Sequence, residues 1–412
     1  MSKAKPLARP NIDLPMGRVE FVALMAMMFA TIAFSIDAML PALETIEADL
    51  PPEDASRAPL IITSFVFGMG LGTFFSGPLS DAFGRRTVMF CGAGLYIGSA
   101  TLAWFSQSLE LVLLARVFQG IGASGPRVVC IAIIRDLFSG REMARIVSFV
   151  MITFTIVPAL APLLGSVIIC FSGWRSIFLA FITFSLISAL WLGLRLPETL
   201  AVENRRPVRM ALMKTAVRQI FQHPIVRLSI VVQTLAMTIL FSLLVLIQPI
   251  YGHVYDKLET FPLWFGGIAV ASAFSSFLNV KLVIRLGMRK LITIALGFQI
   301  VVSTFVLMNS ETIAAEGFAI FAVWQGFIFF QAGLTIGNLN AIAMEPMGHI
   351  AGMAASVVGG VSTTLAAAIA SPVGMLFDGT IRPLVATVLI LAALAFALML
   401  YMGRLEARDP AE

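Results

Sequence analysis

Long apolar stretches alternate with short polar clusters along the whole chain. Each stretch is long enough for a helix to cross a hydrocarbon core of about 30 Å, and a helix satisfies its own backbone hydrogen bonds in lipid. The pattern therefore predicts an all-α membrane protein with about twelve transmembrane helices. Their expected ranges are 19–40, 58–79, 87–107, 109–135, 143–170, 174–195, 225–250, 260–284, 290–308, 313–341, 350–377 and 381–403.

The composition agrees with this pattern. Hydrophobic residues make up 59% of the chain, charged residues 12%, and the mean hydropathy is +0.94, which excludes an ordinary water-soluble globular protein. We expect the first apolar stretch to be a retained helix, because it is too long for a signal peptide and lacks a small-residue cleavage pattern. The hydrophilic stretch 197–223 is basic and indicates a cytoplasmic linker between two six-helix halves, 1–196 and 224–412.

Weak internal repeats support the two halves. They pair RVFQGIG at 116–122 with AVWQGFI at 322–328, FGRR at 83–86 with LGMRK at 286–290, and Pro162 and Gly165 with Pro372 and Gly374. The offsets are nearly constant, between 203 and 210 residues. Such a repeat predicts two pseudo-symmetric halves around a central site.

The distribution of Lys and Arg predicts the orientation, because these residues favour cytoplasmic loops. With the N-terminus in the cytoplasm, that side collects 22 of the 28 basic residues. The opposite side has four, which are Arg57, Arg175, Lys257 and Arg382. We therefore expect a multi-pass protein of the bacterial inner membrane with both termini in the cytoplasm. The net charge of +5 then belongs to a membrane-facing surface, and no nucleic-acid partner is expected.

The loop between the second and third expected helices reads GPLSDAFGRRTV, at 77–88. It resembles the loop motif of the major facilitator superfamily, and the matching residues are Gly77, Asp81, Gly84, Arg85 and Arg86. Glycine permits a tight turn and close helix approach, and Asp81 can accept hydrogen bonds near a helix N-terminus. The resemblance implies two six-helix halves that transport small molecules.

We expect the arginines of this loop to pair with Asp136 at the end of the fourth helix. Such a cluster would form a latch between the two halves on the cytoplasmic side in the outward-facing state. The alternative is that Arg85 and Arg86 only determine topology. In the second-half copy of the loop, Ile284 stands where Asp81 falls, so the latch is expected to be asymmetric.

Two further segments strengthen the resemblance. One is similar to a superfamily motif associated with proton coupling, and the other to the proline and glycine signature of the antiporter branch. Their residues are Arg116, Gln119 and Gly120 in the fourth helix, and Pro158, Pro162 and Gly165 in the fifth. Together with segments such as IDAMLPALETI at 36–46 and LPETL at 196–200, they most resemble the Bcr/CflA-type drug resistance transporters. That resemblance implies multidrug efflux and antibiotic resistance.

Charges inside the expected helices call for a reason, because one near the bilayer centre costs at least about 2.5–3.5 kcal/mol. Asp37 and Arg116 should lie at a similar depth, and we expect them to pair. Burial favours the neutral carboxyl and the arginine favours the charged one, so a modest rearrangement would let Asp37 carry a proton. The alternative is that Asp37 only caps a helix end near the interface, before Pro41.

Arg127 departs from the family pattern. Eleven residues after Arg116, it should point the same way around the fourth helix, with Gly120 and Ala123 leaving room between the two guanidinium groups. Arg127 is then expected either to attract an anionic or zwitterionic substrate, or to join the loop network with Asp136. Amide, methionine and aromatic groups would complete an adaptable cavity. Those substrate-binding candidates are Gln119, Met151, Phe154, Gln248, Tyr251, Gln331, Asn338 and Asn340.

The leading hypothesis is a proton-coupled secondary antiporter that exports small amphiphilic, drug-like molecules by alternating access. The alternative is a dedicated exporter of one endogenous anionic metabolite, such as a siderophore or peptide. An enzyme is not expected, because the chain has no phosphate-binding loop or metalloprotease motif. The expected partners are a small-molecule substrate, protons and membrane lipids, with no cofactor and no metal, and the protein is expected to act as a monomer.

Overall fold

The computed structural model describes residues 15–50, 57–205, 207 and 210–408. Within these residues, twelve helical segments are long and apolar enough to cross a membrane, as the sequence predicts. The first six are built from α1 (Arg18–Asp37), α3 (Leu60–Phe83), α4 (Arg85–Phe105), α5 (Leu109–Leu137), α6 (Gly140–Ser172) and α7 (Ser176–Arg195). The other six are built from α9 (Pro224–Pro249), α10 (Phe261–Ser272) with α11 (Phe274–Leu286), α12 (Met288–Met308), α14 (Phe318–Met344), α15 (Ala351–Gly374) and α16 (Arg382–Arg408).

Shorter helices join some of these spans. The segments η1 (Leu40–Ala42) and α2 (Leu43–Asp49) follow α1, α8 (Met210–Gln222) lies in the expected linker, and α13 (Ser310–Glu316) precedes α14. The eighth span differs from the continuous helix expected over 260–284, because it divides at Ala273 into α10 and α11. Both parts pack against α14 of their own half, but α10 also packs against α6 of the first half, whereas α11 also packs against α12.

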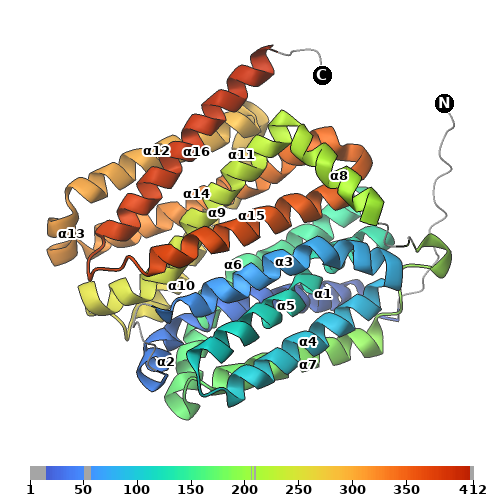
Figure 1. Cartoon of the computed structure of the whole chain (residues 1–412), viewed down its shortest axis with the longest axis horizontal. Helices are drawn as coiled ribbons and strands as arrows, with labels where there is room; N and C mark the ends of the chain where they lie inside the picture. The colour runs from blue at the N-terminus through green and yellow to red at the C-terminus, as the bar shows by residue number, and fades with distance from the viewer. Residues whose placement is uncertain (1–14, 51–56, 206, 208–209, 409–412) are drawn as a thin grey trace.

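The two halves lie side by side, the first coloured blue to green and the second yellow-green to red (Figure 1). At their junction α3 packs along α15, and small residues allow this close approach. A Cβ atom added to Gly70 would lie 2.4 Å from the Oγ1 atom of Thr364, and one added to Gly77 would lie 2.9 Å from the Oγ atom of Ser356. Larger side chains at either glycine would push the halves apart.

The buried apolar clusters differ between the two ends of the helix bundle. Residues such as Leu40 and Phe65 of the first half share one cluster with Tyr251 and Phe265 of the second, at the predicted periplasmic end. At the predicted cytoplasmic end the main buried clusters belong to one half each. Apolar packing therefore joins the halves most strongly at the periplasmic end.

Candidate functional site

Asp37 ends α1 inside the bundle. It is 5% exposed and follows a run of buried residues that begins at Met28. Within the described part of the chain, its carboxyl group has no hydrogen bond or ion pair. Helix α6 lies directly beside it, because a Cβ atom added to Gly165 would be 2.2 Å from the carbonyl oxygen of Ala38. Glycine at this position therefore allows α6 to reach the end of α1.

Arg116 is fully buried, but it does not pair with Asp37 as the sequence suggested. Its guanidinium group donates to the carbonyl oxygens of Ile61 at 3.2 Å and Ser35 at 2.8 Å, and to the Oε1 atom of Gln119 at 2.8 Å. The charge also lies 4.4 Å from the ring centroid of Phe65. Two residues correspond to about 200° around a helix, so the Asp37 side chain leaves α1 on nearly the opposite side from Ser35. Arg116 therefore holds α1, α3 and α5 together.

The second half has a related but neutral cluster. Gln325 occupies the position of Gln119 in the repeat, and its Oε1 atom accepts a hydrogen bond from the Tyr251 hydroxyl at 2.8 Å. The rings of Phe261 and Phe318 pack edge-on against Tyr251, which is fully buried. In this structure Tyr251 is therefore enclosed by aromatic side chains and bonded to Gln325, and its contact with substrate stays a prediction.

Arg127 points from the first half to the second. Its Nη1 atom donates to the Thr363 hydroxyl of α15 at 3.2 Å, and that hydroxyl lies 3.7 Å from the sulfur of Met237 on α9. The alternative partner, Asp136, is held by other groups, so Arg127 does not join the loop network. Gly120 does not provide the expected room beside the arginines, because the carbonyl oxygen of Phe65 occupies that space. Arg116 therefore faces into the first half while Arg127 faces Thr363 of the second.

The other substrate-binding candidates are spread over several environments. Asn338 donates to Asn279 of α11 at 2.7 Å, and Gln331 donates to Thr335 one turn along its own helix. Gln248 is buried, Asn340 is half-buried and Met151 is 37% exposed. The side chain of Phe154 lies outside the described residues. Among the described residues, none of these side chains is a hydrogen-bond partner of Arg127, and their contact with substrate stays a prediction.

Sequence reasoning missed Gln233, which is fully buried on α9 one helical turn before Met237. Neither atom of its amide group has a hydrogen-bond partner among the described residues. A buried amide without partners costs free energy, so this group is a further candidate for contact with a bound molecule. The available signal was an amide in the middle of a long, mostly apolar helix, which also contains Gln248 near its end.

The loop motif builds a charged cluster between α3, α4 and α5. Arg85, only 3% exposed, donates to Asp81 at 2.5 Å and to Asp136 at 2.9 Å. The expected contact with Asp136 is therefore present. Asp81 lies in the last turn of α3, so it does not cap a helix N-terminus. Glu198 takes that role, accepting from the backbone N–H groups of Arg85 at 2.9 Å and Arg86 at 3.1 Å.

The charged members of this cluster do not cross between the halves as expected of a latch. Within the described residues, the partners of Arg85 all belong to the first half or to the segment directly after α7. Arg86 donates to the carbonyl oxygen of Gly193 at 2.8 Å and therefore also stays in the first half. Gly77 is the motif residue that faces α15. The sequence analysis missed the role of Glu198, because the segment LPETL served only as a family signature. The available signal was an acidic residue shortly after the end of the sixth transmembrane helix.

Helix α6, which carries the expected proline and glycine motif, contacts both halves. Gly165 meets the end of α1, and six residues earlier Ala159 meets Gly266 of α10, where an added Cβ atom would lie 2.4 Å from the Ala159 carbonyl oxygen. Pro158 and Pro162 lie inside α6 around these contacts. The described part of α6 therefore connects the surroundings of Asp37 with the second half.

Comparison with known proteins agrees with this architecture. The family model described as Major Facilitator Superfamily matches residues 21–371. The bicyclomycin resistance protein homolog of Haemophilus influenzae is 27% identical over 359 residues, covering 86% of this chain and 88% of that relative. Multidrug resistance protein MdtL of Shewanella oneidensis is 27% identical over 377 residues, covering 90% of this chain and 92% of that relative.

Among solved structures, a D-xylose-proton symporter superposes with a TM-score of 0.73 at 14% identity, covering 92% of this chain and 97% of that chain. This likeness concerns the fold. The twelve apolar helices and the bacterial relatives indicate a multi-pass protein of the bacterial inner membrane. The superfamily consists of transporters and not enzymes. With its family pattern matched over most of its length, the chain belongs to the major facilitator superfamily.

Proposed function

We propose that this protein is a proton-coupled antiporter that exports small amphiphilic, drug-like molecules from the cytoplasm by alternating access. The bicyclomycin and multidrug resistance proteins among its relatives support the substrate class. The observation that carries proton coupling is Asp37, a buried carboxyl group without an ion-pair partner among the described residues. A buried acid of this kind is expensive unless it serves a function.

The position of Asp37 links its charge to the junction of the halves. Protonation removes a charge next to Ala38, which α6 contacts through Gly165. About 9 Å further along α6, at 1.5 Å per residue, Ala159 contacts Gly266 of α10. A change in the packing at the end of α1 would therefore act on the same helix that touches the second half. This arrangement supports coupling between proton uptake and rearrangement of the halves.

The proton gradient can supply enough free energy for such transport. One pH unit provides about 1.4 kcal/mol per proton. A membrane potential of 100 mV adds about 2.3 kcal/mol for each net charge moved. Together these values support accumulation ratios well above tenfold.

Arg127 favours a second candidate function, the export of one endogenous anionic metabolite. Its guanidinium group lies between the halves and binds only one hydroxyl group among the described residues. Guanidinium groups bind carboxylates through two parallel hydrogen bonds, so donors remain for an anionic substrate. Gln233 and Met237 on α9 would supply amide and thioether contacts beside it.

The test measures substrate-induced proton movement in proteoliposomes for the wild type, Asp37→Asn and Arg127→Gln, with cationic, neutral and anionic compounds. We expect Asp37→Asn to bind substrate but to lose coupled proton movement. Glu110→Gln is the matched control, because this exposed acid pairs with Arg57 outside the bundle interior. Proton coupling that survives in Asp37→Asn would overturn the carrier assignment. A preference for anions that Arg127→Gln abolishes would favour the dedicated exporter.

A further inference from the structure

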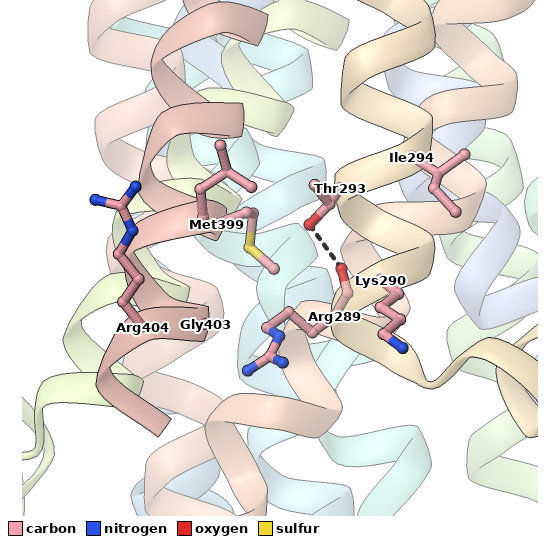
Figure 2. A pocket seen from close by; sticks show the side chains of 8 residues that line it. Arg289, Lys290, Thr293, Ile294, Met399, Gly403 and Arg404 are labelled. Carbon is pink, nitrogen blue, oxygen red and sulfur yellow. Dashed lines mark hydrogen bonds between the residues drawn. The ribbon is translucent and has the colours of Figure 1, made fainter. Parts of the chain in front are cut away.

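A pocket of about 540 Å³ lies on the outer side of the second half, between the start of α12 and the end of α16. Its walls combine basic and apolar side chains (Figure 2). The lining residues are Arg289, Lys290, Thr293, Ile294, Met399, Leu400, Gly403 and Arg404. Ile294 and Leu400 are 57% and 47% exposed, so the pocket opens toward the lipid-facing surface.

The basic side chains of the pocket have N–H donors that are available to bind an anion. Arg289 reaches from α12 toward α16 (Figure 2), where its Cζ atom would lie 3.3 Å from a Cβ atom added to Gly403. It forms an ion pair with Glu406 through one nitrogen, which leaves most of its five N–H donors available. Lys290 and Arg404 have no ion pair with any described residue. Three basic residues therefore line this pocket, and among the described residues only Arg289 is paired with a carboxylate, that of Glu406.

At the corresponding site in the first half, a carboxylate of the protein itself occupies the helix end. There, Glu198 accepts hydrogen bonds from the first N–H groups of α4. Arg404 stands at the matching position of the second half, at the same offset that relates Gln119 to Gln325. No described side chain accepts from the first N–H groups of α12. An anion in the pocket would be stabilised both by the basic side chains and by this helix end.

From these contacts we infer that the pocket binds the phosphate group of an anionic phospholipid. The phosphate lies among Arg289, Lys290 and Arg404, and the acyl chains run along Ile294 and Leu400. A basic pocket between transmembrane helices, level with the headgroups, matches the chemistry of such a lipid. The exposed apolar wall distinguishes a lipid from a free phosphate ion, which would gain nothing from that surface.

The test uses native mass spectrometry of the purified full-length protein with phosphatidylglycerol and phosphatidylcholine. The wild type is expected to bind phosphatidylglycerol at least about tenfold more tightly than phosphatidylcholine. Arg289→Gln/Arg404→Gln should bind phosphatidylglycerol roughly thirtyfold more weakly than the wild type, because each basic residue near an anionic lipid surface contributes about a factor of five. Arg289→Lys/Arg404→Lys should retain most of the affinity, because lysine also binds phosphate.

Two further variants distinguish lipid binding at this pocket from non-specific electrostatic attraction and from a purely structural effect. Arg227→Gln removes an exposed basic residue at the same end of the bundle outside the pocket, and it should leave lipid affinity unchanged. Glu406→Gln removes the competing carboxylate and should strengthen phosphatidylglycerol binding a few-fold, which a purely structural ion pair would not do. Equal affinity for the two lipids would overturn the inference, as would unchanged binding in the double glutamine variant. Displacement of the lipid by millimolar inorganic phosphate would assign the pocket to free phosphate and overturn it as well.

Discussion

The loop after α3 and the loop after α11 have the same backbone turn but different charges. Each turn contains a glycine with positive φ, 99° at Gly84 and 79° at Gly287, and a long helix begins directly after it. In the first half, Arg85 is buried and bound by two aspartates. In the second half, Met288 stands in its place. The turn therefore requires glycine but does not require the charges.

The two halves also hold this region together differently. The first uses Arg85 to join α3, α4 and α5, and Glu198 to tie the start of α4 to the segment after α7. The second packs apolar residues such as Leu296, Ile342 and Met399 between α12, α14 and α16. The second half has one partly exposed ion pair here, Arg289 with Glu406, whereas the first half buries Arg85 between two aspartates, which points to a role of that cluster in addition to folding. The difference between the halves that Asp81 and Ile284 predict therefore extends beyond the loop, to the contacts between the surrounding helices.

Arg85→Ala should destabilise the protein more than any equivalent change in the second half. It leaves Asp81 and Asp136 close together without their shared cation, and removing one member of a buried ion pair costs about 3 kcal/mol or more. The measurement is the thermal unfolding midpoint of the purified protein in detergent. Arg289→Ala is the matched control in the second half, where a partly exposed pair contributes at most about 1 kcal/mol. Equal shifts for both variants would show that the two loops are equivalent after all.

The sequence predicted the twelve spans because lipid imposes one simple rule, that each span must be long, apolar and helical. It also predicted the contact of Arg85 with Asp136, because a family motif and the end of the fourth helix placed both at one membrane surface. It failed for Asp37 and Arg116. Depth in the membrane gives only one coordinate, and the partners of Arg116 include backbone carbonyl oxygens that leave no trace in sequence.

The contact of Glu198 with the start of α4 shows another limit. The two groups are more than one hundred residues apart, and the contact depends on the chain returning to α4 after α7. The division of the eighth span at Ala273 was also hidden, since both parts are apolar and the difference lies in their neighbours. Hydropathy describes the contact of a helix with lipid, but not which helices it meets.

Glu198→Ala should have an intermediate effect. It removes the acceptor of two backbone N–H groups at the start of α4, and the loss of such a cap costs about 0.5–2 kcal/mol. Hydrogen exchange should become faster at the amides of Arg85 and Arg86, as measured by mass spectrometry. Glu406→Ala is the comparison in the second half, because its carboxylate binds the Arg289 side chain. Faster exchange at the start of α12 in that variant would contradict the difference between the halves.

The variant with the smallest expected effect is Arg404→Glu. It is also the most specific test, because it gives the second half the acidic residue that the first half has. Arg404→Glu places a carboxylate at the position that matches Glu198, where it can accept from the amides of Met288 and Arg289. An acid at a helix N-terminus stabilises it by about 0.3–1 kcal/mol, so exchange at these two amides should slow. Arg404→Gln separates loss of the positive charge from formation of the cap, and it should leave exchange nearly unchanged. If both variants slow exchange equally, the charge of Arg404 and not the missing acceptor distinguishes the second half from the first.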